Sequence, residues 1–442
     1  MIPSRNLVRL LLLLLLAAVV GALTRPLAGA TGPELDLLWL AAAAALLVVA
    51  VADGLAAWQP PGITVRRTLP ASLPLGVSHA VRLRISNATA RARAIEVFDH
   101  HPPHFDVRGL PQRVTVPAGG WTECTYEVRP IRRGDQLFGR TDVRVDSPLR
   151  LWARRLALGE PGVTRVYPNF AALTRYALLA LDNRLSQIGI LQRRRRGEGL
   201  EFHQLRDYRE GDALRSIDWK ATTRLQRLIA REYQDERDQQ IVLLIDCGRR
   251  MAAHDGELSH FDHVLNAALL LAYVCLRQGD AVGFMTTSGV ERFLAPRKSA
   301  ATVSVMLNRL YDLHPTAATT DYYRAALELS SRLRKRALVV VLSNLRDEDD
   351  DTLAPALELL SARHLVLFAS LREHVLTRAL HARVSTFDRA LTHAAAAGYL
   401  ENRALALRRV ARSGAVVLDV EPEQLPVALV NRYLEVKRSG RL

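Results

Sequence analysis

Cysteine is scarce in this sequence of 442 residues, with only Cys124, Cys247 and Cys275, which lie far apart. Three isolated cysteines provide neither a disulfide framework nor the paired spacing of a zinc site, so we expect a reducing compartment. The sequence also lacks the P-loop, GxSxG, HExxH and GxGxxG motifs that mark common nucleotide-binding and hydrolytic sites. We therefore expect a protein without enzymatic activity.

Acidic residues are fewer than basic ones, and the formal net charge is +15. Residues 1–60 carry equal numbers of both signs, so the whole excess lies in residues 61–442. A basic soluble body can meet nucleic acid, an anionic membrane surface or an acidic protein. Composition alone does not choose between these three partners.

Two long apolar runs occupy residues 7–23 and 37–58. Trp39 and Trp58 bracket the second run, and a helix would separate them by about 28 Å, which matches the interfacial positions that Trp prefers. The sequence therefore predicts a hairpin of two transmembrane helices over residues 1–60.

The orientation of this hairpin follows from its basic flanks. Arg5 and Arg9 precede the first run, and Arg66 and Arg67 follow the second, whereas the connection holds one Arg. The positive-inside rule then places both termini and the main body in the cytosol. We therefore expect a multi-pass protein of the cell membrane with two spans. The alternative is a cleaved signal peptide ending near LAGA (27–30), after which the second run would still keep the body cytosolic.

Two folded regions follow the hairpin. Residues 62–160 alternate apolar and polar side chains between turn residues, which predicts an antiparallel β-sandwich of roughly seven strands, immunoglobulin-like in class. Residues 239–442 contain continuous apolar runs that alternate with helical stretches. This pattern predicts a parallel sheet covered by helices on both faces, with ligands at the carboxyl ends of the strands.

The first of these strands ends in Asp246, followed by CGRRM. A strand end of this kind resembles the metal-ion-dependent adhesion site of von Willebrand factor A domains, in which two serines follow the Asp at alternate positions. Here Gly248 and Arg250 occupy both serine positions. The Arg250 guanidinium could take the place of the cation by pairing with Asp246.

The other expected ligands of that site are one Thr and a second Asp. Thr319 or Thr320 matches the Thr, and Asn344 stands where the Asp belongs. We therefore interpret Asp246, Thr320 and Asn344 as a degenerate metal site that holds no ion, and expect no cofactor. The alternative is a hydrolase dependent on Mg²⁺ or another divalent cation and centred on Asp246, with oxygens from Asp347–Asp351. The acidic run also suits the start of a helix.

Residues 197–224, GEGLEFHQLRDYREGDALRSIDWKATTR, closely resemble the signature of the domain of unknown function 58 family. The match includes Gly199, Glu201, Phe202, Leu205, Arg206, Tyr208, Gly211, Asp212, Arg215, Ile217, Trp219 and Arg224. The resemblance implies a membrane-anchored protein whose von Willebrand A-like domain, here residues 239–442, binds proteins. It also implies a partnership with a MoxR-type AAA+ ATPase. Residues 161–238 then form a connecting segment that carries the signature.

The signature itself suggests a folded clasp or a docking surface. Gly211 suits a tight turn, and Asp218 is placed to cap a helix at Trp219. The candidate residues are Arg206, Tyr208, Gly211, Asp212, Arg215, Asp218, Trp219 and Arg224. Their nearly balanced charges argue against nucleic acid.

The basic run Arg193, Arg194, Arg195 and Arg196 precedes the signature. It is a better candidate than the signature for binding an anionic surface or nucleic acid, although the favoured interpretation of the run is a solvated, mobile loop.

Overall fold

The computed structural model describes residues 1–28, 32–58, 62–169, 201–209, 214–234, 239–346 and 350–441. Gly211, Asp212 and Arg193–Arg196 lie outside these ranges. The chain divides into two compact units, Met1–Val166 and Tyr167–Leu442.

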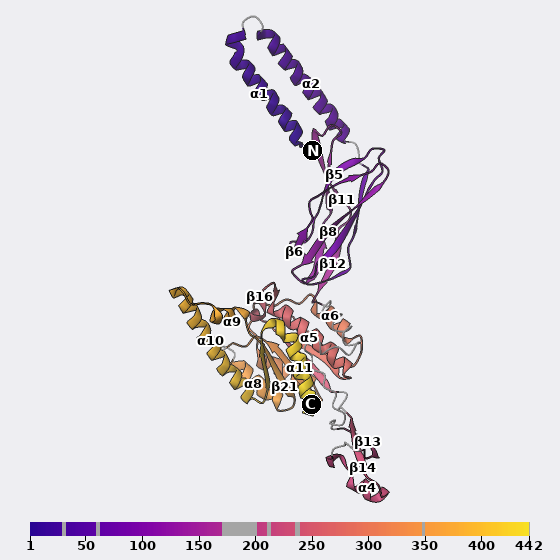
Figure 1. Cartoon of the computed structure of the whole chain (residues 1–442), viewed down its shortest axis with the longest axis vertical. Helices are drawn as coiled ribbons and strands as arrows, with labels where there is room; N and C mark the ends of the chain where they lie inside the picture. Colours follow the sequence, from indigo (N-terminus) through magenta and orange to yellow (C-terminus); the bar gives the residue numbers. More distant parts are fainter. Residues whose placement is uncertain are drawn as a thin grey trace. The chain divides into compact units, whose positions relative to one another are not determined.

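The first unit begins with two antiparallel helices, α1 (Arg5–Ala28) and α2 (Gly32–Trp58) (Figure 1). The Trp39 indole donates to the Leu14 carbonyl across the hairpin, at 2.9 Å. The segments Arg5–Leu23 and Asp36–Trp58 are long and apolar enough to cross a membrane, and only 6% and 11% of them are buried. Exposed apolar surface of this extent distinguishes the pair from core helices of a soluble protein.

Antiparallel strands make up the rest of this unit. They are β2 (Ile63–Thr68), β3 (Ser72–Pro74), β4 (His79–Asn87), β5 (Arg93–Asp99), β6 (Phe105–Arg108), β7 (Gln112–Val116), β8 (Trp121–Pro130), β9 (Gly134–Phe138), β10 (Thr141–Asp146), β11 (Trp152–Leu158) and β12 (Gly162–Tyr167). A two-residue strand, β1 (Ile2–Pro3), pairs with β11.

These strands form three sheets, with orders β1-β11-β10-β5-β7, β2-β4-β8-β6 and β3-β12-β9. Alternate side chains enter the core, as in β4, where Val81, Leu83 and Ile85 are fully buried. The β-rich region is confirmed. Residues 62–160 hold ten strands, β2–β11, rather than the roughly seven expected. Part of the difference is due to β3 and β6, which have three and four residues and are too short for a visible alternation.

A hydrogen-bonded joint connects α2 to the loop between β10 and β11. Asp53 is 3% exposed and accepts hydrogen bonds from the Ser147 hydroxyl and from the backbone N–H groups of Leu149, at 2.9 Å, and Leu151, at 3.1 Å. The Trp152 indole also donates to the α2 carbonyl of Ala50, at 2.8 Å. In this group of contacts, which we call the Asp53 joint, both oxygens of the carboxylate accept hydrogen bonds from residues 147–151.

The start of α1 joins the same loop. Leu7, Ala50 and Leu151 form a small apolar cluster of their own, and the Ser4 N–H donates to the Leu151 carbonyl at 2.8 Å. Both ends of the hairpin are therefore fixed on residues 147–152.

The second unit contains a six-stranded sheet of order β19-β18-β15-β20-β21-β22. Its strands are β15 (Gln240–Asp246), β18 (Ala281–Thr287), β19 (Phe293–Arg297), β20 (Leu338–Ser343), β21 (Leu365–Leu371) and β22 (Val416–Val420). Five strands run parallel, as the continuous apolar runs predicted. The edge strand β19 is antiparallel and was not expected.

Helices cover both faces of this sheet (Figure 1). On β15, Ile241, Leu243 and Ile245 pack in one core with α5 (His260–Arg277), α6 (Thr302–Leu310) and α11 (Leu425–Arg438). Val242 and Leu244 pack on the other face with α7 (Tyr322–Arg332), α8 (Asp350–Ser361) and α10 (Phe387–Arg412). The two-residue period of a strand thus supplies both cores. The helix α9 (His374–His381) follows β21.

The described part of the signature region, residues 201–209 and 214–234, forms a small module. Its strands β13 (Glu201–Asp207) and β14 (Ile229–Gln234) are antiparallel, and between them lie a 3₁₀ turn at Leu214–Ser216 and the helix α4 (Trp219–Leu225). Further short elements are 3₁₀ turns at Arg249–Ala252 and Pro422–Gln424 and the two-residue strands β16 (His254–Asp255) and β17 (Leu258–Ser259).

Candidate functional site

The Asp246 carboxylate lies at the carboxyl end of β15 and is 2% exposed. One oxygen accepts from the Gly248 N–H, at 2.8 Å, and from the Thr320 hydroxyl, at 2.5 Å. The other accepts from the Tyr322 hydroxyl, at 2.9 Å, and from the Ser343 hydroxyl, at 2.5 Å. Three hydroxyls and one amide therefore solvate the buried charge in place of water.

These contacts bring together some of the metal-ligand candidates and separate others. Thr320 lies on Asp246 as expected, but Ser343, one residue before Asn344, is the β20 side chain that reaches the carboxylate. The expected ion pair between Arg250 and Asp246 is not among the carboxylate's contacts in the described part of the chain.

This composition does not suit a divalent cation, which prefers several carboxylate or carbonyl oxygens. The site has one carboxylate, and both of its oxygens already accept two hydrogen bonds. No group of three or more His, Cys, Asp or Glu side chains converges on a metal-sized space anywhere within the described ranges.

Gly248 is required by the same packing. A Cβ atom at this position would lie 2.4 Å from the Thr320 hydroxyl oxygen and 3.1 Å from the Ala318 carbonyl oxygen. Real Cβ atoms do not approach so closely, so a serine could not stand here without displacing Thr320. The glycine at position 248 and the Thr320–Asp246 contact are therefore parts of one arrangement.

Asn344 belongs to a second network at the same edge of the sheet. Its amide nitrogen donates to Glu373, at 2.9 Å, and lies 3.3 Å from the His260 Nδ1. Its carbonyl oxygen accepts from the Arg403 guanidinium at 3.2 Å. Asn344 thus links the end of β20 to α5, α9 and α10, rather than to Asp246.

Arg403 is the centre of this network and is 2% exposed. Its guanidinium donates to the Ser370 hydroxyl, at 2.6 Å, the Leu371 carbonyl, at 2.7 Å, and the Asp419 carboxylate, at 2.7 Å. A buried charge with this many acceptors is paired rather than strained. Sequence reasoning missed Arg403, because this residue lies in the middle of α10, far from the strand ends.

Burial and hydrogen bonding shift the pKa values around Asn344 in opposite ways. Burial lowers the pKa of His260, although Glu373 and Asp255 oppose the shift. For Glu373, burial raises the pKa, but the hydrogen bond from Asn344, a backbone N–H and the Arg403 charge together lower it. The network therefore combines a neutral imidazole with a charged carboxylate.

The signature module fulfils one expectation from the sequence directly. Asp218 caps α4, because its side chain accepts from the Ala221 N–H at 3.0 Å. The Asp218 N–H donates to the Ile229 carbonyl at 2.8 Å, which attaches the cap to β14. The Tyr208 N–H donates to the Leu228 carbonyl at 2.9 Å. Arg206 donates to the backbone of its neighbour Asp207.

The apolar side chains of this module differ in their burial. Ile217 is buried, but Trp219 is 66% exposed and Leu214 is 74% exposed. Arg224, in the last turn of α4, is exposed as well. Three more exposed leucines accompany them, Leu205, Leu225 and Leu228. We call Leu205, Leu214, Trp219, Leu225 and Leu228 the Trp219 surface.

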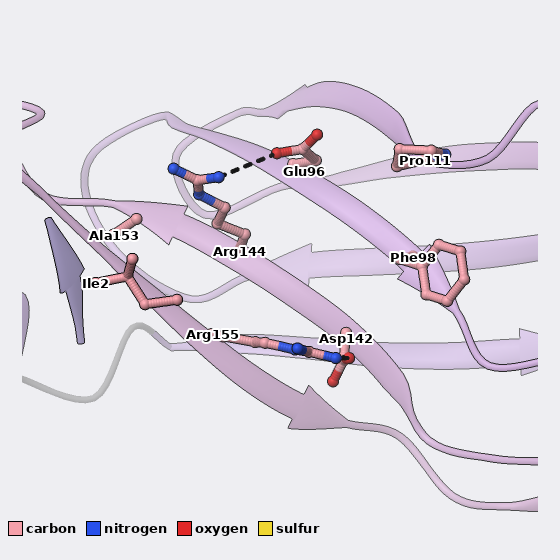
Figure 2. A pocket seen from close by; sticks show the side chains of 8 residues that line it. All are labelled: Ile2, Glu96, Phe98, Pro111, Asp142, Arg144, Ala153 and Arg155. Carbon is pink, nitrogen blue, oxygen red and sulfur yellow. Dashed lines mark hydrogen bonds and ion pairs between the residues drawn. The ribbon is translucent and has the colours of Figure 1, made fainter. Parts of the chain in front are cut away.

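The first unit contains a pocket of about 330 Å³ on the sheet β1-β11-β10-β5-β7 (Figure 2). Its apolar lining is Ile2, Phe98, Pro111 and Ala153. Its charged lining is Glu96, Asp142, Arg144 and Arg155. We call this the Phe98 pocket, and sequence reasoning did not predict it, because its lining comes from four strands and one loop.

The charges of the Phe98 pocket differ in how firmly they are paired. The Arg155 guanidinium donates to Asp142 at 2.8 Å, and the His100 Nε2 lies 2.6 Å from the same carboxylate. Burial raises the pKa of Asp142, but these two contacts outweigh it and lower the pKa. Arg144 is held more loosely, 3.9 Å from Glu96 and 42% exposed at its side chain.

The family model described as "Protein of unknown function DUF58" matches residues 204–380. The match begins inside β13 and ends in α9, so it includes most of the signature module and all the Asp246 contacts. Of the second network it includes Asn344, His260 and Glu373, whereas Arg403 and Asp419 lie beyond it. The resemblance to the DUF58 family is therefore confirmed over residues 204–380. No curated protein sequence matches the chain.

Solved structures resemble parts of the chain weakly. An aerotolerance-related membrane protein from Bacteroides fragilis NCTC 9343 is 12% identical, covers 46% of this chain and 99% of its own, and has a TM-score of 0.30. A FixG-related protein from Vibrio parahaemolyticus is 11% identical over 24% of this chain and 97% of its own, with a TM-score of 0.18. Salmonella alpha-2-macroglobulin is 16% identical, and the match covers 24% of this chain and 7% of that protein, with a TM-score of 0.19.

Proposed function

We propose that this protein is a membrane-anchored protein-interaction module without enzymatic activity of its own. In this proposal the β-rich region is an immunoglobulin-like sandwich and the α/β region is von Willebrand A-like. Both lie in the cytosol, where a MoxR-type AAA+ ATPase is the expected partner. The two membrane-length helices and the match to the DUF58 model support the anchoring and the class of protein.

The Trp219 surface is the observation that carries this proposal. Large apolar side chains gather on a module of few residues, and Trp219 and Leu214 are more than half exposed. Exposed Trp and Leu side chains in one small module are consistent with a protein interface, where Trp often contributes most of the binding energy. The docking interpretation of the signature is therefore favoured over the clasp.

The Asp246 site favours a non-catalytic role. Its carboxylate is enclosed by four donors, so it is poorly placed to hold a cation or activate water. This supports the interaction module over a hydrolase centred on Asp246.

Capture of the tagged full-length chain from membranes in mild detergent tests the proposal. We expect Trp219→Ala to reduce the recovered partner about tenfold, because removing one interface Trp commonly weakens binding by at least that factor. Trp121→Ala is the matched control, since Trp121 is 51% exposed but lies in the β-rich region, under Arg84.

Equal recovery by wild type and Trp219→Ala would overturn the docking role of this surface. Recovery without any AAA+ ATPase would overturn that choice of partner. Reporter fusions at the C-terminus test the cytosolic placement separately, and a periplasmic or extracellular signal would contradict it.

A further inference from the structure

The Phe98 pocket is fixed close to the membrane-proximal ends of both helices. The loop 147–152, which the Asp53 joint holds against α2, connects β10 to β11, and these strands supply Asp142, Arg144, Ala153 and Arg155 to the pocket. Ile2 lines the pocket from β1, and α1 begins three residues later, a distance of about 10 Å along the chain. If α1 and α2 cross a bilayer, the pocket therefore lies at headgroup level.

The arginines of the pocket are arranged in an unusual way. Arg144 and Arg155 are direct partners in the β10–β11 register, and like charges in this position destabilise a sheet. Asp142 compensates Arg155 through a short hydrogen bond, whereas Arg144 has Glu96 at 3.9 Å and Asp146 at 3.9 Å. Arg144 and Glu96 are therefore close enough to attract each other but too far apart for a hydrogen bond.

We propose that the Phe98 pocket binds the zwitterionic headgroup of a phospholipid that carries a primary ammonium group, such as phosphatidylethanolamine. The Arg144 guanidinium faces the phosphate, and the Glu96 carboxylate accepts from the ammonium group. Ile2 and Phe98 contact the apolar part of the lipid next to the headgroup. This proposal rests on the membrane-anchored part of the proposed function.

The charge balance of the pocket selects this headgroup over an anionic one. Two arginines and two carboxylates line it, so the lining itself carries no net charge that would favour an anionic ligand. Arg113, which lies outside the lining and is 81% exposed at its side chain, is 3.8 Å from Glu96. A ligand with one charge of each sign, at a spacing of a few ångströms, satisfies Arg144 and Glu96 together. The apolar lining favours a lipid over a soluble phosphate ester of the same headgroup, because only the lipid has apolar surface to bury.

Native mass spectrometry of the full chain in detergent tests this inference. Phosphatidylethanolamine, phosphatidylglycerol, diacylglycerol and soluble phosphoethanolamine are added singly. We expect phosphatidylethanolamine to be retained about tenfold more than each of the others, and Arg144→Gln and Glu96→Gln each to abolish this preference. Arg82→Gln is the matched control, because Arg82 is exposed on β4 with a carboxylate, Glu123, at 3.8 Å.

Each outcome decides one part of the proposal. Equal retention of phosphatidylglycerol would overturn the zwitterionic assignment, and equal binding of soluble phosphoethanolamine would overturn the lipid assignment. An unchanged preference in Glu96→Gln, with melting temperatures equal to wild type, would overturn the role of that carboxylate. Extraction of the chain from membranes with alkaline carbonate separates the two hypotheses, since a chain that resists extraction but shows no lipid preference keeps its anchoring and loses only the pocket.

Discussion

Asp246 shows how hydroxyl groups can stabilise a buried carboxylate at the edge of a parallel sheet. Each of its oxygens accepts two hydrogen bonds, and the donors come from β20, from the start of α7 and from the turn after β15. Hydrogen bonds to a charged acceptor are stronger than those between neutral groups, so this carboxylate ties three segments of the chain together.

A serine in place of Gly248 is expected to destabilise the protein. In Gly248→Ser the new Cβ atom would lie 2.4 Å from the Thr320 hydroxyl oxygen, so overpacking should lower the free energy of unfolding by about 1–3 kcal/mol. Thermal melting with and without 5 mM Mg²⁺, a concentration on the order of that used for weak cation sites, measures the change.

The control for this substitution is Gly398→Ser, because nothing lies within 4 Å of a Cβ atom added at Gly398 in α10. We expect the control to melt at or slightly above the wild-type temperature. A Gly248→Ser variant that is as stable as wild type, or that Mg²⁺ stabilises, would contradict this account of the site.

At the scale of elements, the start of α5 contains two buried histidines whose titration affects stability. A capping box formed by Ser259 and Asp262 begins the helix, and His260 and His263 follow within its first turn, both buried. Burial lowers the pKa of both imidazoles below the ordinary value of 6.5. Protonation of either one therefore opposes folding.

The consequence is a loss of stability in mild acid. Below pH 6.5 the histidines of the unfolded chain bind protons, whereas the folded His260 and His263 stay neutral to lower pH. Their contribution to the free energy of unfolding is complete above pH 6.5 and is lost as the pH is lowered toward 5. We expect His260→Gln to flatten this fall while keeping an acceptor near Asn344. Melting temperatures measured from pH 7.5 to 5.0 test this, with His381→Gln, an exposed histidine in α9, as the control.

A fall of the same steepness in His260→Gln and wild type would show that other groups cause the acid sensitivity. His364 is the first alternative, because burial lowers its pKa as well.

Most elements of the α/β region could be predicted from the sequence, and its side-chain networks could not. Continuous apolar runs identified β15, β18, β20, β21 and β22, because a strand buried on both faces needs apolar side chains at every position. The edge strand β19 has no such run. At the site, the sequence placed Asn344 one residue from the true contact, Ser343, because a shift of one residue in a strand reverses the side-chain direction.

The signature module shows the same limit in another form. The Asp218 cap was predictable, since capping depends on a residue and its immediate successors. The exposure of Trp219 was not, because an exposed and a buried Trp have the same sequence pattern. Sequence spacing identified the family, and the structure added which side chains of the signature face solvent.

At the scale of the whole molecule, the hairpin and the β-rich region of the first unit share an interface built around one carboxylate. In Asp53→Ala, the N–H groups of Leu149 and Leu151 and the Ser147 hydroxyl lose their acceptor. Unsatisfied buried donors cost about 1–3 kcal/mol each, so we expect the first unit to melt at a clearly lower temperature.

Differential scanning calorimetry of the full chain in detergent measures this effect. Asp135→Ala is the control, because the Asp135 side chain is 58% exposed in the same unit. If the two variants have equal melting temperatures, the Asp53 joint contributes little to stability. The helices are then attached mainly by the apolar cluster of Leu7, Ala50 and Leu151.

The Asp53 joint also bears on how this protein can be cut for expression. A fragment that begins after Trp58 would lack Asp53, the hydrogen-bond acceptor of loop 147–152, and also Leu7 and Ala50, the apolar partners of Leu151. The folded body would then expose unpaired hydrogen-bond donors and an apolar side chain at this end. Such a soluble fragment is therefore expected to aggregate through this end. A useful truncation would need a polar replacement of Leu151 and a new acceptor for Ser147. A soluble fragment therefore depends on replacing the contacts of Asp53 and Leu151, and not only on the residue at which the fragment begins.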